Sequence, residues 1–471
     1  MKYMLAAMLL FSAGALSAKT QPKYVFYFIG DGMGLNQVLG AEIYKANADG
    51  KSLEYELFSF AEFPVNTYAT SKSALTYVTD SSAAGTALAS GHKTVNSMLG
   101  VKEDGVTPVN SIAYYAKKAG YKVGVTSTVG VNHATPGSFY GHNKNRSAYY
   151  EIGLQLAESD FDFFGAGGFL GEVEDSAEKP SLANVARKAG YTVAWGKEQY
   201  DRTKGAAEKM ILFQDDSTAT SLPYAIDRKE GDLTLAQIVE SAIEFLSKDN
   251  KKGFFLMAEG GMIDYAGHDN DVVTSYEETI DFAEAIDVAV EFYRQHPKET
   301  LIVVTADHET GGLALGTAGQ YELNYDLLHC QKGSKDAISL ALGELRVQNE
   351  NKVSWEQVKG FLKENFGFWD KIQPTMKQEI KLMEAYDMSF SRRFGMGRDG
   401  RVAVTTDEPV VLAALGVLYE HALVSFSSGG HTGVFVPVYA IGVGADKFMR
   451  GSLDNTDLPK IIAELAGYPI E

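Results

Sequence analysis

Two pairs of an aspartate and a histidine are the residues of this chain best suited to chemistry. Asp264 and His268 are four residues apart, and Asp307 and His308 are adjacent. A further histidine, His431, lies in the glycine-rich segment Gly-Gly-His-Thr-Gly. Taken alone, each of these side chains is most often a surface or capping residue. Carboxylate and imidazole are also the usual ligands of Zn²⁺, so two such pairs in one chain suggest two metal ions that act together.

A serine hydroxyl could act beside such metals. Asp80 and Ser81 precede a run of small residues that is typical of a helix start, where free N–H groups favour an anion or a developing alkoxide. The alternative is that Asp80 or Ser81 only caps the helix. A serine attacks at neutral pH only if a base or a metal takes its proton. Because the chain has no convincing Gly-x-Ser-x-Gly motif, metal activation is favoured over a Ser-His-Asp triad.

Arg146 is a candidate for binding the anion itself. Its planar guanidinium group could hold two oxygens of a tetrahedral anion at once. Alone, it would be one surface arginine among others.

The elements that position these residues follow an alternating pattern. Apolar runs typical of strands are each followed by a glycine or acidic turn and then by a helical pattern. The clearest such runs are 24–29, 122–126, 253–257 and 301–305. Apolar residues at three- and four-residue spacing predict helices over 235–246 and 275–293. The alternation predicts an α/β sheet with helices on both faces.

Three acidic residues come directly after predicted strands. They are Asp31, Glu259 and Asp307. Ligands of open α/β sheets bind beyond the carboxyl ends of the strands, so these side chains are expected to converge although they are far apart in the sequence.

The segment from about 320 to about 426 differs from the rest. It is rich in Lys, Glu and Gln, partly helical and then irregular. We interpret it as an insertion over the sheet edge or the mouth of the site, within one catalytic domain that covers 19–471.

Composition limits the partners of the protein. The chain has 471 residues, 45% of them hydrophobic, and a formal net charge of −18. It is therefore globular, and its acidic character argues against nucleic acid or an anionic membrane as the main partner. Cys330 is the only cysteine, which excludes an intramolecular disulfide.

The first eighteen residues have the pattern of a secretory signal. A basic start is followed by an apolar stretch and then by small residues, with cleavage expected after Ser17 or Ala18. An uncleaved membrane anchor is the alternative, but the apolar stretch is short for a bilayer span. The expected mature protein is exported to the periplasm or secreted, and does not bind the membrane.

In combination, these motifs resemble those of the alkaline phosphatase family. The matching blocks are Gly30-Asp-Gly-Met-Gly34, Val78-Thr-Asp-Ser-Ser-Ala-Ala-Gly-Thr86, His133-Ala-Thr135 with Arg146, Glu259 through His268, Thr305-Ala-Asp-His308 and His431-Thr-Gly433. The resemblance implies a three-layer α/β/α sandwich with a large, mostly parallel central sheet and an inserted crown-like region. It also implies hydrolysis of small phosphate monoesters through a phosphoserine, and a homodimer.

The resemblance further implies two Zn²⁺ ions and one Mg²⁺ ion. The ligands of one zinc would be Asp264, His268 and His431. Those of the other, which faces Ser81, would be Asp31, Asp307 and His308. The magnesium ligands would be Asp31, Thr135 and Glu259, all of which are the oxygen donors that a hard cation prefers.

Three further residues are expected to support the ligands without binding a metal. Asp80 precedes the serine. His133 stands where other members carry an aspartate, and Tyr265 stands where some place a cation or an imidazole. These departures are expected to change the polarity around the site, and with it turnover, pH optimum and affinity for Mg²⁺.

Other activities remain as alternatives. Phosphodiesterases, sulfatases and metal-dependent mutases share the two-metal core. A sulfatase requires a Cys/Ser-x-Pro-x-Arg motif, which Cys330 lacks. Arg146 and the third, oxygen-rich site favour a dianionic monoester. A secreted metal- or phosphate-binding protein without turnover is the alternative from another class, but it does not require Ser81.

Overall fold

The computed structural model describes residues 21–51, 53–176, 178–391, 394–395 and 402–470. The expected signal segment, 1–18, lies outside the described residues. Among the residues described, no helix is both long and apolar enough to cross a lipid bilayer.

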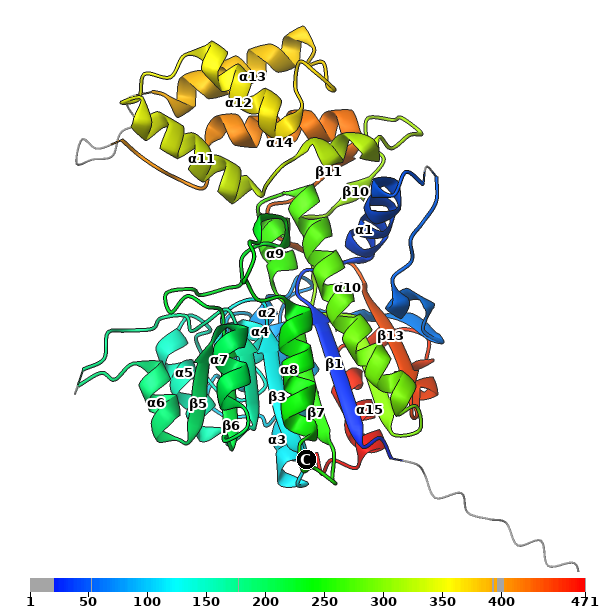
Figure 1. Ribbon diagram of the computed structural model, residues 1–471. Coiled ribbons are helices and arrows are strands. Elements are labelled where there is room, and N and C mark those ends of the chain that lie inside the picture. Colours follow the sequence, from blue (N-terminus) through cyan, green and yellow to red (C-terminus); the bar gives the residue numbers. More distant parts are fainter. Residues whose placement is uncertain (1–20, 52, 177, 392–393, 396–401, 471) are drawn as a thin grey trace, which may run out of the picture.

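A ten-stranded sheet forms the centre of the protein (Figure 1). In spatial order its strands are β14 (Leu453–Asp454), β2 (Val65–Thr70), β13 (Val436–Gly442), β8 (Thr300–Ala306), β1 (Tyr24–Gly30), β7 (Phe254–Gly260), β3 (Lys122–Ser127), β4 (Phe163–Ala166), β6 (Lys209–Phe213) and β5 (Tyr191–Trp195). Strand β13 is antiparallel to both of its neighbours, and the other pairings are parallel. The prediction of a large, mostly parallel sheet is therefore confirmed.

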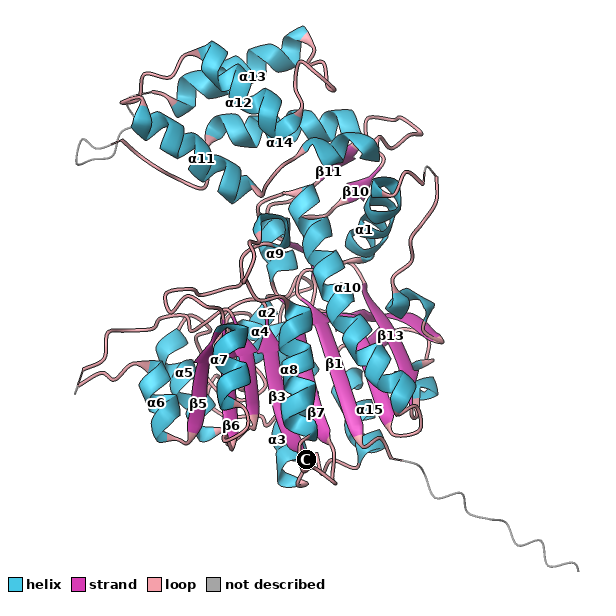
Figure 2. Ribbon diagram, viewed as in Figure 1, coloured by secondary structure: helices cyan, strands magenta, loops and turns pink. Residues whose placement is uncertain are grey.

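Helices cover both faces of this sheet (Figure 2). They are α2 (Ser81–Ser90), α3 (Ile112–Lys118), α4 (Ala134–Gly137), α5 (Tyr149–Glu158), α6 (Leu182–Lys188), α7 (Gly196–Thr203), α8 (Leu235–Ser247), α10 (Val272–Gln295) and α15 (Asp457–Ala466). Two further helices, α1 (Leu35–Ala48) and α9 (Met262–His268), lie beyond the carboxyl ends of the parallel strands (Figure 1). Helices α8 and α10 correspond to the two helices that the apolar spacing predicts.

The aromatic residues of β1 show how the two layers of helices are fixed. Phe28 lies against Phe282 of α10, with ring centroids 6.0 Å apart. Tyr27, the residue before Phe28, points to the other face. Its ring centroid lies 6.2 Å from that of Phe139, which follows α4. Successive strand residues face opposite sides. A strand whose two faces are both covered must be apolar throughout, and all seven residues of β1 are buried.

A helical region stands above the carboxyl ends of the parallel strands (Figure 1). It contains α11 (Lys335–Gln348), α12 (Trp355–Phe366), α13 (Met376–Ser389) and α14 (Pro409–Ala422). The chain enters it through β10 (Ala314–Leu315) and leaves through β11 (Val424–Ser425), which pair antiparallel. These helices fall within the stretch of about 320–426 that the sequence sets apart. A two-stranded antiparallel ribbon therefore joins the helical region to the rest of the protein.

Polar contacts also hold the helical region to the sheet domain. The Lys335 ammonium group of α11 lies 2.7 Å from an oxygen of Asp269 and 2.8 Å from one of Asp407. The backbone N–H of Lys335 donates to Asp271, which caps the start of α10. Because Asp269 directly follows α9, the position of the helical region is tied to the helix that carries Asp264 and His268.

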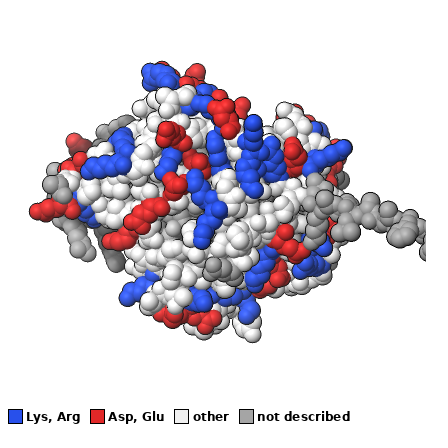
Figure 3. Space-filling model, turned by 90° about the horizontal axis from the view of Figure 1, so that it is seen from below, with Lys and Arg blue, Asp and Glu red and all other residues white. Residues whose placement is uncertain are grey.

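The face at the opposite end of the sheet carries charges of both signs. Lys and Arg side chains stand among Asp and Glu side chains over this surface (Figure 3). The net charge of −18 is therefore not spread as a uniform acidic layer.

A buried carboxyl on α10 makes the stability of the fold depend on pH. Glu278 is 2% exposed and accepts a hydrogen bond from the backbone N–H of Ala225 at 2.6 Å. Burial and the neighbouring Asp281 raise its pKa from 4.5 to about 8, although Arg228 opposes the shift. The folded chain therefore holds this proton more tightly than the unfolded chain does.

We expect Glu278→Gln to remove this pH dependence. The contribution of Glu278 to the free energy of unfolding is complete below pH 4.5 and is lost as the pH rises through about 8. Urea unfolding of both proteins should show a stability difference that shifts by roughly 1–3 kcal/mol in favour of the variant between about pH 5 and about pH 9. A difference that stays constant over this range would show that Glu278 is ionised in the folded chain at neutral pH.

Candidate metal centre

The carboxyl ends of three neighbouring strands bring the acidic residues together. Strand β1 lies between β7 and β8, and Ile29 is in register with Glu259. Asp31 follows β1 directly, and Asp307 follows β8. All three carboxyl side chains are fully buried. The convergence expected from the strand pattern is thus present in the structure.

One group of ligand atoms surrounds the Nε2 atom of His308. This atom lies 3.4 Å from Asp31 Oδ1, 3.2 Å from Asp307 Oδ2 and 3.3 Å from Ser81 Oγ. Ligand atoms at 2.0–2.1 Å from a tetrahedral Zn²⁺ are about 3.3 Å apart. The spacing of this group therefore fits one zinc ion, with the Ser81 hydroxyl beside it.

A second group contains Asp264, His268 and His431. The two histidine Nε2 atoms are 3.1 Å apart, and each lies 3.5 Å from an oxygen of Asp264. The Nδ1 atoms of the rings face backbone carbonyl oxygens, of Gly429 at 2.9 Å for His268 and of Thr79 at 2.8 Å for His431. A carbonyl only accepts, so each Nδ1 carries a hydrogen and each Nε2 is turned toward the other ring and toward Asp264. Three ligand atoms thus face one point, where a shared cation would be stabilised.

The two groups adjoin each other. The rings of His308 and His431 are stacked, with centroids 3.6 Å apart. Asp264, His308 and His431 also have ligand atoms close enough to hold one ion. The exposure of the ligands differs: the His268 side chain is 41% exposed and that of His308 is fully buried. The site therefore opens to solvent on the side of His268.

A third group lies behind Asp31. The Thr135 hydroxyl donates to Asp31 Oδ2 at 3.4 Å, and Ser127 donates to Glu259. Asp31, Glu259 and His133 have ligand atoms close enough to hold an ion. His133 is thus nearer to this group than the sequence indicates. Ser127 was not predicted, because a serine at the end of a strand gives no signal of its own.

The buried carboxylates repel one another. Burial, followed by the charges of Asp307, Asp264 and Glu259, raises the pKa of Asp31 well above its ordinary value. Burial is also the main cause that raises the pKa of Glu259 to about 7. Asp31 Oδ1, Glu259 Oε1 and Asp307 Oδ2 are buried without a hydrogen-bond donor among the described residues. Divalent cations would satisfy these atoms and compensate their charge.

Ser81 is the first residue of α2. Asp80 caps this helix by accepting from the backbone N–H of Ala83 at 2.9 Å. Asp80 therefore provides the cap, which leaves the Ser81 hydroxyl free to face His308. The cap is thus Asp80, and a catalytic role of Ser81 stays a prediction.

Arg146 contacts the residue before Ser81 and is held on two sides. Its Nη1 group donates to Asp80 Oδ2 at 3.2 Å, and its Nη2 group lies 3.2 Å from His133 Nε2. Burial, with the charge of Arg146, lowers the pKa of His133 to about 3, so the imidazole is neutral and can accept from Arg146. Tyr265 packs edge-on against His133 at 5.8 Å. Asp80 and His133 thus orient Arg146.

A short pair of strands brings His431 beside the segment that follows His308. Strand β9 (Glu309–Thr310) pairs antiparallel with β12 (His431–Thr432). Glu309 joins both strands to α1, because it accepts from Thr432 and, at 2.9 Å, from Gln37 of α1. Sequence reasoning missed Glu309. Its only signal is that it follows Asp307-His308 directly.

Thr310 connects the group around His308 with the group that contains Asp264. Its hydroxyl donates to Asp264 Oδ1 at 2.5 Å and lies 3.2 Å from His308 Nδ1. Thr310 is fully buried. The hydroxyl can therefore orient Asp264 and, by accepting from Nδ1, leave the Nε2 lone pair of His308 free for a metal.

We expect Thr310→Val to weaken metal binding by about 10- to 100-fold, because an isosteric side chain without a hydroxyl leaves Asp264 and His308 unsupported. Thr310→Ser retains the hydroxyl and serves as the control. Zinc affinity would be measured by competition with a chromogenic chelator. Equal affinities of the Val and Ser variants would exclude a role of the hydroxyl in metal binding.

Comparisons with known proteins identify one family. The family model described as "Alkaline phosphatase" matches residues 22–161 and 171–468. Alkaline phosphatase 4 of Bacillus subtilis is 30% identical over 460 residues, which cover 95% of this chain and 90% of the relative. The alkaline phosphatase of Schizosaccharomyces pombe is 28% identical, covering 93% of this chain and 80% of the relative.

Solved structures agree as well. The cold-active alkaline phosphatase of a psychrophilic Shewanella species is 30% identical with a TM-score of 0.76, covering 94% of this chain and 99% of that one. The alkaline phosphatase of Thermus thermophilus is 26% identical, also with a TM-score of 0.76, covering 98% and 96%. The chain therefore belongs to the alkaline phosphatase family, whose members are metal-dependent phosphomonoester hydrolases.

Proposed function

We propose that the protein hydrolyses phosphate monoesters to an alcohol and inorganic phosphate through a phosphoserine at Ser81. The observation that carries this proposal is the position of the Ser81 hydroxyl, 3.3 Å from His308 Nε2 at the start of a buried helix. A protein that only binds metal or phosphate does not require a hydroxyl at this point.

We assign the metals from the chemistry of the three groups. Asp264, His268 and His431 would hold one Zn²⁺, and Asp31, Asp307 and His308 the other. Asp31, Thr135 and Glu259 would hold Mg²⁺, as their oxygen atoms suit a hard cation. Bound zinc supplies Lewis-acid charge, which favours the serine alkoxide and stabilises the oxygen of the departing alcohol.

The residues of the chain then have distinct tasks. Ser81 Oγ loses its proton to water and forms a bond to phosphorus, while the bond from phosphorus to the alcohol oxygen breaks on the opposite side and that oxygen takes up a proton from water. The guanidinium group of Arg146 binds the non-bridging oxygens, and Asp80 and His133 keep it in place. A water molecule then attacks phosphorus from the side that the alcohol has left, which releases phosphate and restores the Ser81 hydroxyl.

Arg146 also supports a monoester over a diester. A monoester phosphate has two negative charges. Burial lowers the pKa of Arg146, but the charges of Asp80 and Asp31 outweigh this effect and raise the pKa above its ordinary value. A fixed cation in a partly buried position binds a dianion more strongly than a monoanion. Phosphodiesterase activity on the same core is the second candidate function.

Phosphate release before and after chelation, with metal analysis of the purified protein, tests the proposal. We expect zinc in the active protein, loss of phosphate release from a monoester on chelation, and recovery with Zn²⁺ and Mg²⁺. A phosphodiester that is hydrolysed faster than its monoester would contradict the assignment, as would an active protein without any divalent metal.

The location and assembly of the protein are separate proposals. We propose export to the periplasm or the medium, on the basis of the signal-like pattern of residues 1–18. The family resemblance further suggests a homodimer. Fractionation of expressing cells and the molar mass in solution would test these two points.

A further inference from the structure

Asp271 is a buried carboxylate at the turn between α9 and α10. Helix α9 carries Asp264 and ends at His268, and Asp271 caps the start of α10. Asp271 is 1% exposed. A buried carboxylate is stable only where donors satisfy its oxygens, so the origin of these donors shows which parts of the protein the residue connects.

Donors from two parts of the protein surround this carboxylate. Within α10, the backbone N–H of Thr274 donates at 3.2 Å and the Thr274 hydroxyl donates at 2.7 Å. From the inserted segment, Gln331 Nε2 donates at 2.8 Å, the backbone N–H of Lys335 at 2.7 Å and the Tyr419 hydroxyl at 3.1 Å. A helix cap requires only the first of these bonds. The bonds from the inserted segment therefore serve to hold that segment against the start of α10.

Tyr419 of α14 contacts the same turn a second time. Its hydroxyl also accepts from the backbone N–H of Val272, the first residue of α10, at 3.0 Å. Tyr419 is buried. A shift of the turn relative to α14 would break both hydrogen bonds of this hydroxyl, so the helical region and the turn are fixed to each other.

Hydrogen bonds within the turn extend this constraint to His268. The backbone N–H of Asp271 donates to the Ala266 carbonyl oxygen at 2.9 Å, and that of Asn270 donates to the Gly267 carbonyl oxygen at 3.1 Å. Helix α9 has only seven residues, and so short a helix depends on tertiary contacts for its position. The contacts around Asp271 therefore fix the end of α9 at which His268 lies.

His268 is the most exposed ligand of its group. Its side chain is 41% exposed, whereas those of Asp264 and His431 are 5% and 13% exposed. Its Nδ1 atom lies 2.9 Å from the carbonyl oxygen of Gly429, in the segment that follows β11. Both the turn behind His268 and the loop that contacts its ring thus adjoin the helical region.

We propose that Asp271 is a positioning residue through which the helical region holds His268 in place for the zinc ion on the solvent side, the one assigned to Asp264, His268 and His431. This inference rests on the metal assignment in the proposed function. A ligand that is already in place loses less conformational entropy when a metal binds, so the contact raises the affinity for this ion.

The test removes the contact without removing a ligand. Competition between the zinc-loaded protein and a chromogenic chelator gives one phase for each zinc, and the phase that is absent in His268→Ala belongs to the solvent-side ion. We expect Tyr419→Phe to weaken this phase by about three- to tenfold and Asp271→Asn by about 10- to 100-fold, while the other phase stays within about twofold of the wild type. The two variants are independent, because Tyr419→Phe retains the carboxylate and the cap of α10.

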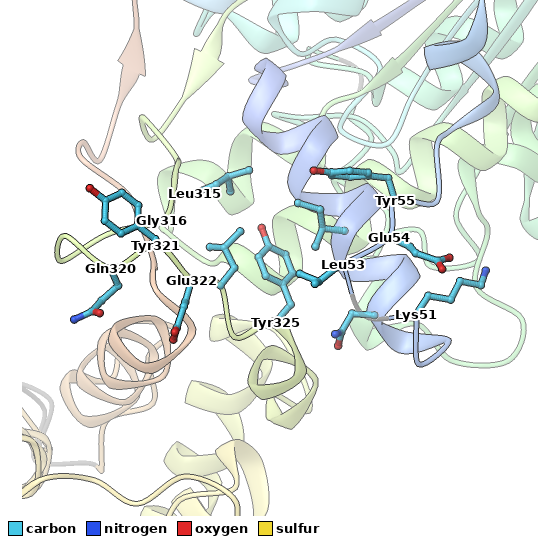
Figure 4. Close-up of a pocket in the computed structure, with 13 residues that line it drawn as sticks. Lys51, Leu53, Glu54, Tyr55, Leu315, Gly316, Gln320, Tyr321, Glu322 and Tyr325 are labelled. Carbon is cyan, nitrogen blue, oxygen red and sulfur yellow. The ribbon is translucent and has the colours of Figure 1, made fainter.

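Two other tyrosines of the inserted segment provide matched controls. The Tyr386 hydroxyl donates to the Val353 carbonyl oxygen at 2.8 Å, within the helical region. The Tyr325 hydroxyl lies 2.9 Å from that of Tyr276 in α10, and Tyr325 lines a hollow of about 520 Å³ beside α1 (Figure 4). Tyr386→Phe and Tyr325→Phe each remove one hydroxyl, as Tyr419→Phe does, but from bonds away from the turn after α9. Both variants should keep the wild-type affinity for each zinc.

Activity at high zinc separates positioning from other effects. Raising the concentration of free Zn²⁺ should restore kcat/KM of Asp271→Asn for a phosphate monoester to within about threefold of the wild-type value, since Asp271 is not itself a ligand of the proposed site. Activity that stays low with both zinc sites filled would overturn the inference.

The zinc affinities give further outcomes. Wild-type affinity in both Tyr419→Phe and Asp271→Asn would overturn the inference alone, as would an equal weakening of both zinc phases, which would indicate a general loss of stability. Wild-type protein that binds no zinc would overturn the metal assignment, and with it the proposed function.

Discussion

Replacing Ser81 by alanine is expected to lower kcat/KM for a phosphate monoester by about 10⁴-fold or more, because the covalent intermediate can no longer form. The metal content should not change, since the ligand groups around His308 and His431 do not depend on the hydroxyl. Single-turnover assays with a radiolabelled phosphate ester would trap labelled protein only in the wild type.

A matched control is available in the same helix. Ser90, at the other end of α2, is buried, and its hydroxyl donates to the Thr86 carbonyl oxygen at 2.7 Å. Ser90→Ala removes a similar hydroxyl without touching the site, so activity should remain close to the wild-type value. If Ser81→Ala retained full activity with its metals in place, water would attack the substrate directly and no seryl intermediate would exist.

Asp31→Asn is expected to have the broadest effect on metal binding. Asp31 Oδ1 belongs to the His308 group, while Oδ2 accepts from Thr135 in the third group. An amide has the shape of the carboxylate but lacks the charge that both groups require. We expect loss of more than one metal per chain and a fall in kcat/KM of about 10³-fold or more.

Metal analysis by plasma mass spectrometry would measure this loss. Asp49→Asn serves as the control, since Asp49 lies on the surface and, among the described residues, its side chain pairs only with the exposed Lys51. Circular dichroism would show that the variant is folded. An Asp31→Asn protein with its full metal content would mean that Asp31 does not bridge two ions.

The main features of the fold can be predicted from the sequence because each depends on a local pattern. The runs that become β1, β7 and β8 are continuously apolar, since both faces of these strands are covered. Asp31 and Asp307 follow such runs, so the rule that parallel strands end at one edge is enough to bring them together.

Other features depend on contacts that no local pattern records. Thr310 reaches Asp264, which is 46 residues away, and its hydroxyl looks in sequence like any strand threonine. Arg146 could be recognised as an anion ligand, but its contact with His133 depends on how two loops fold. Tyr68 of β2 packs against Phe435, which precedes β13, and this contact becomes visible only in the sheet order.

The pairing of β9 with β12 has a consequence for how a newly made chain folds. Glu309 and Thr432, which pair beside the two histidines, are 123 residues apart in the chain, with the whole helical region between them. A nascent polypeptide that stops within that region has His268 and His308 but not His431, so the group of Asp264, His268 and His431 cannot assemble. The proposed metal site on the solvent side can therefore form only after nearly the whole chain has been made and β12 has paired with β9.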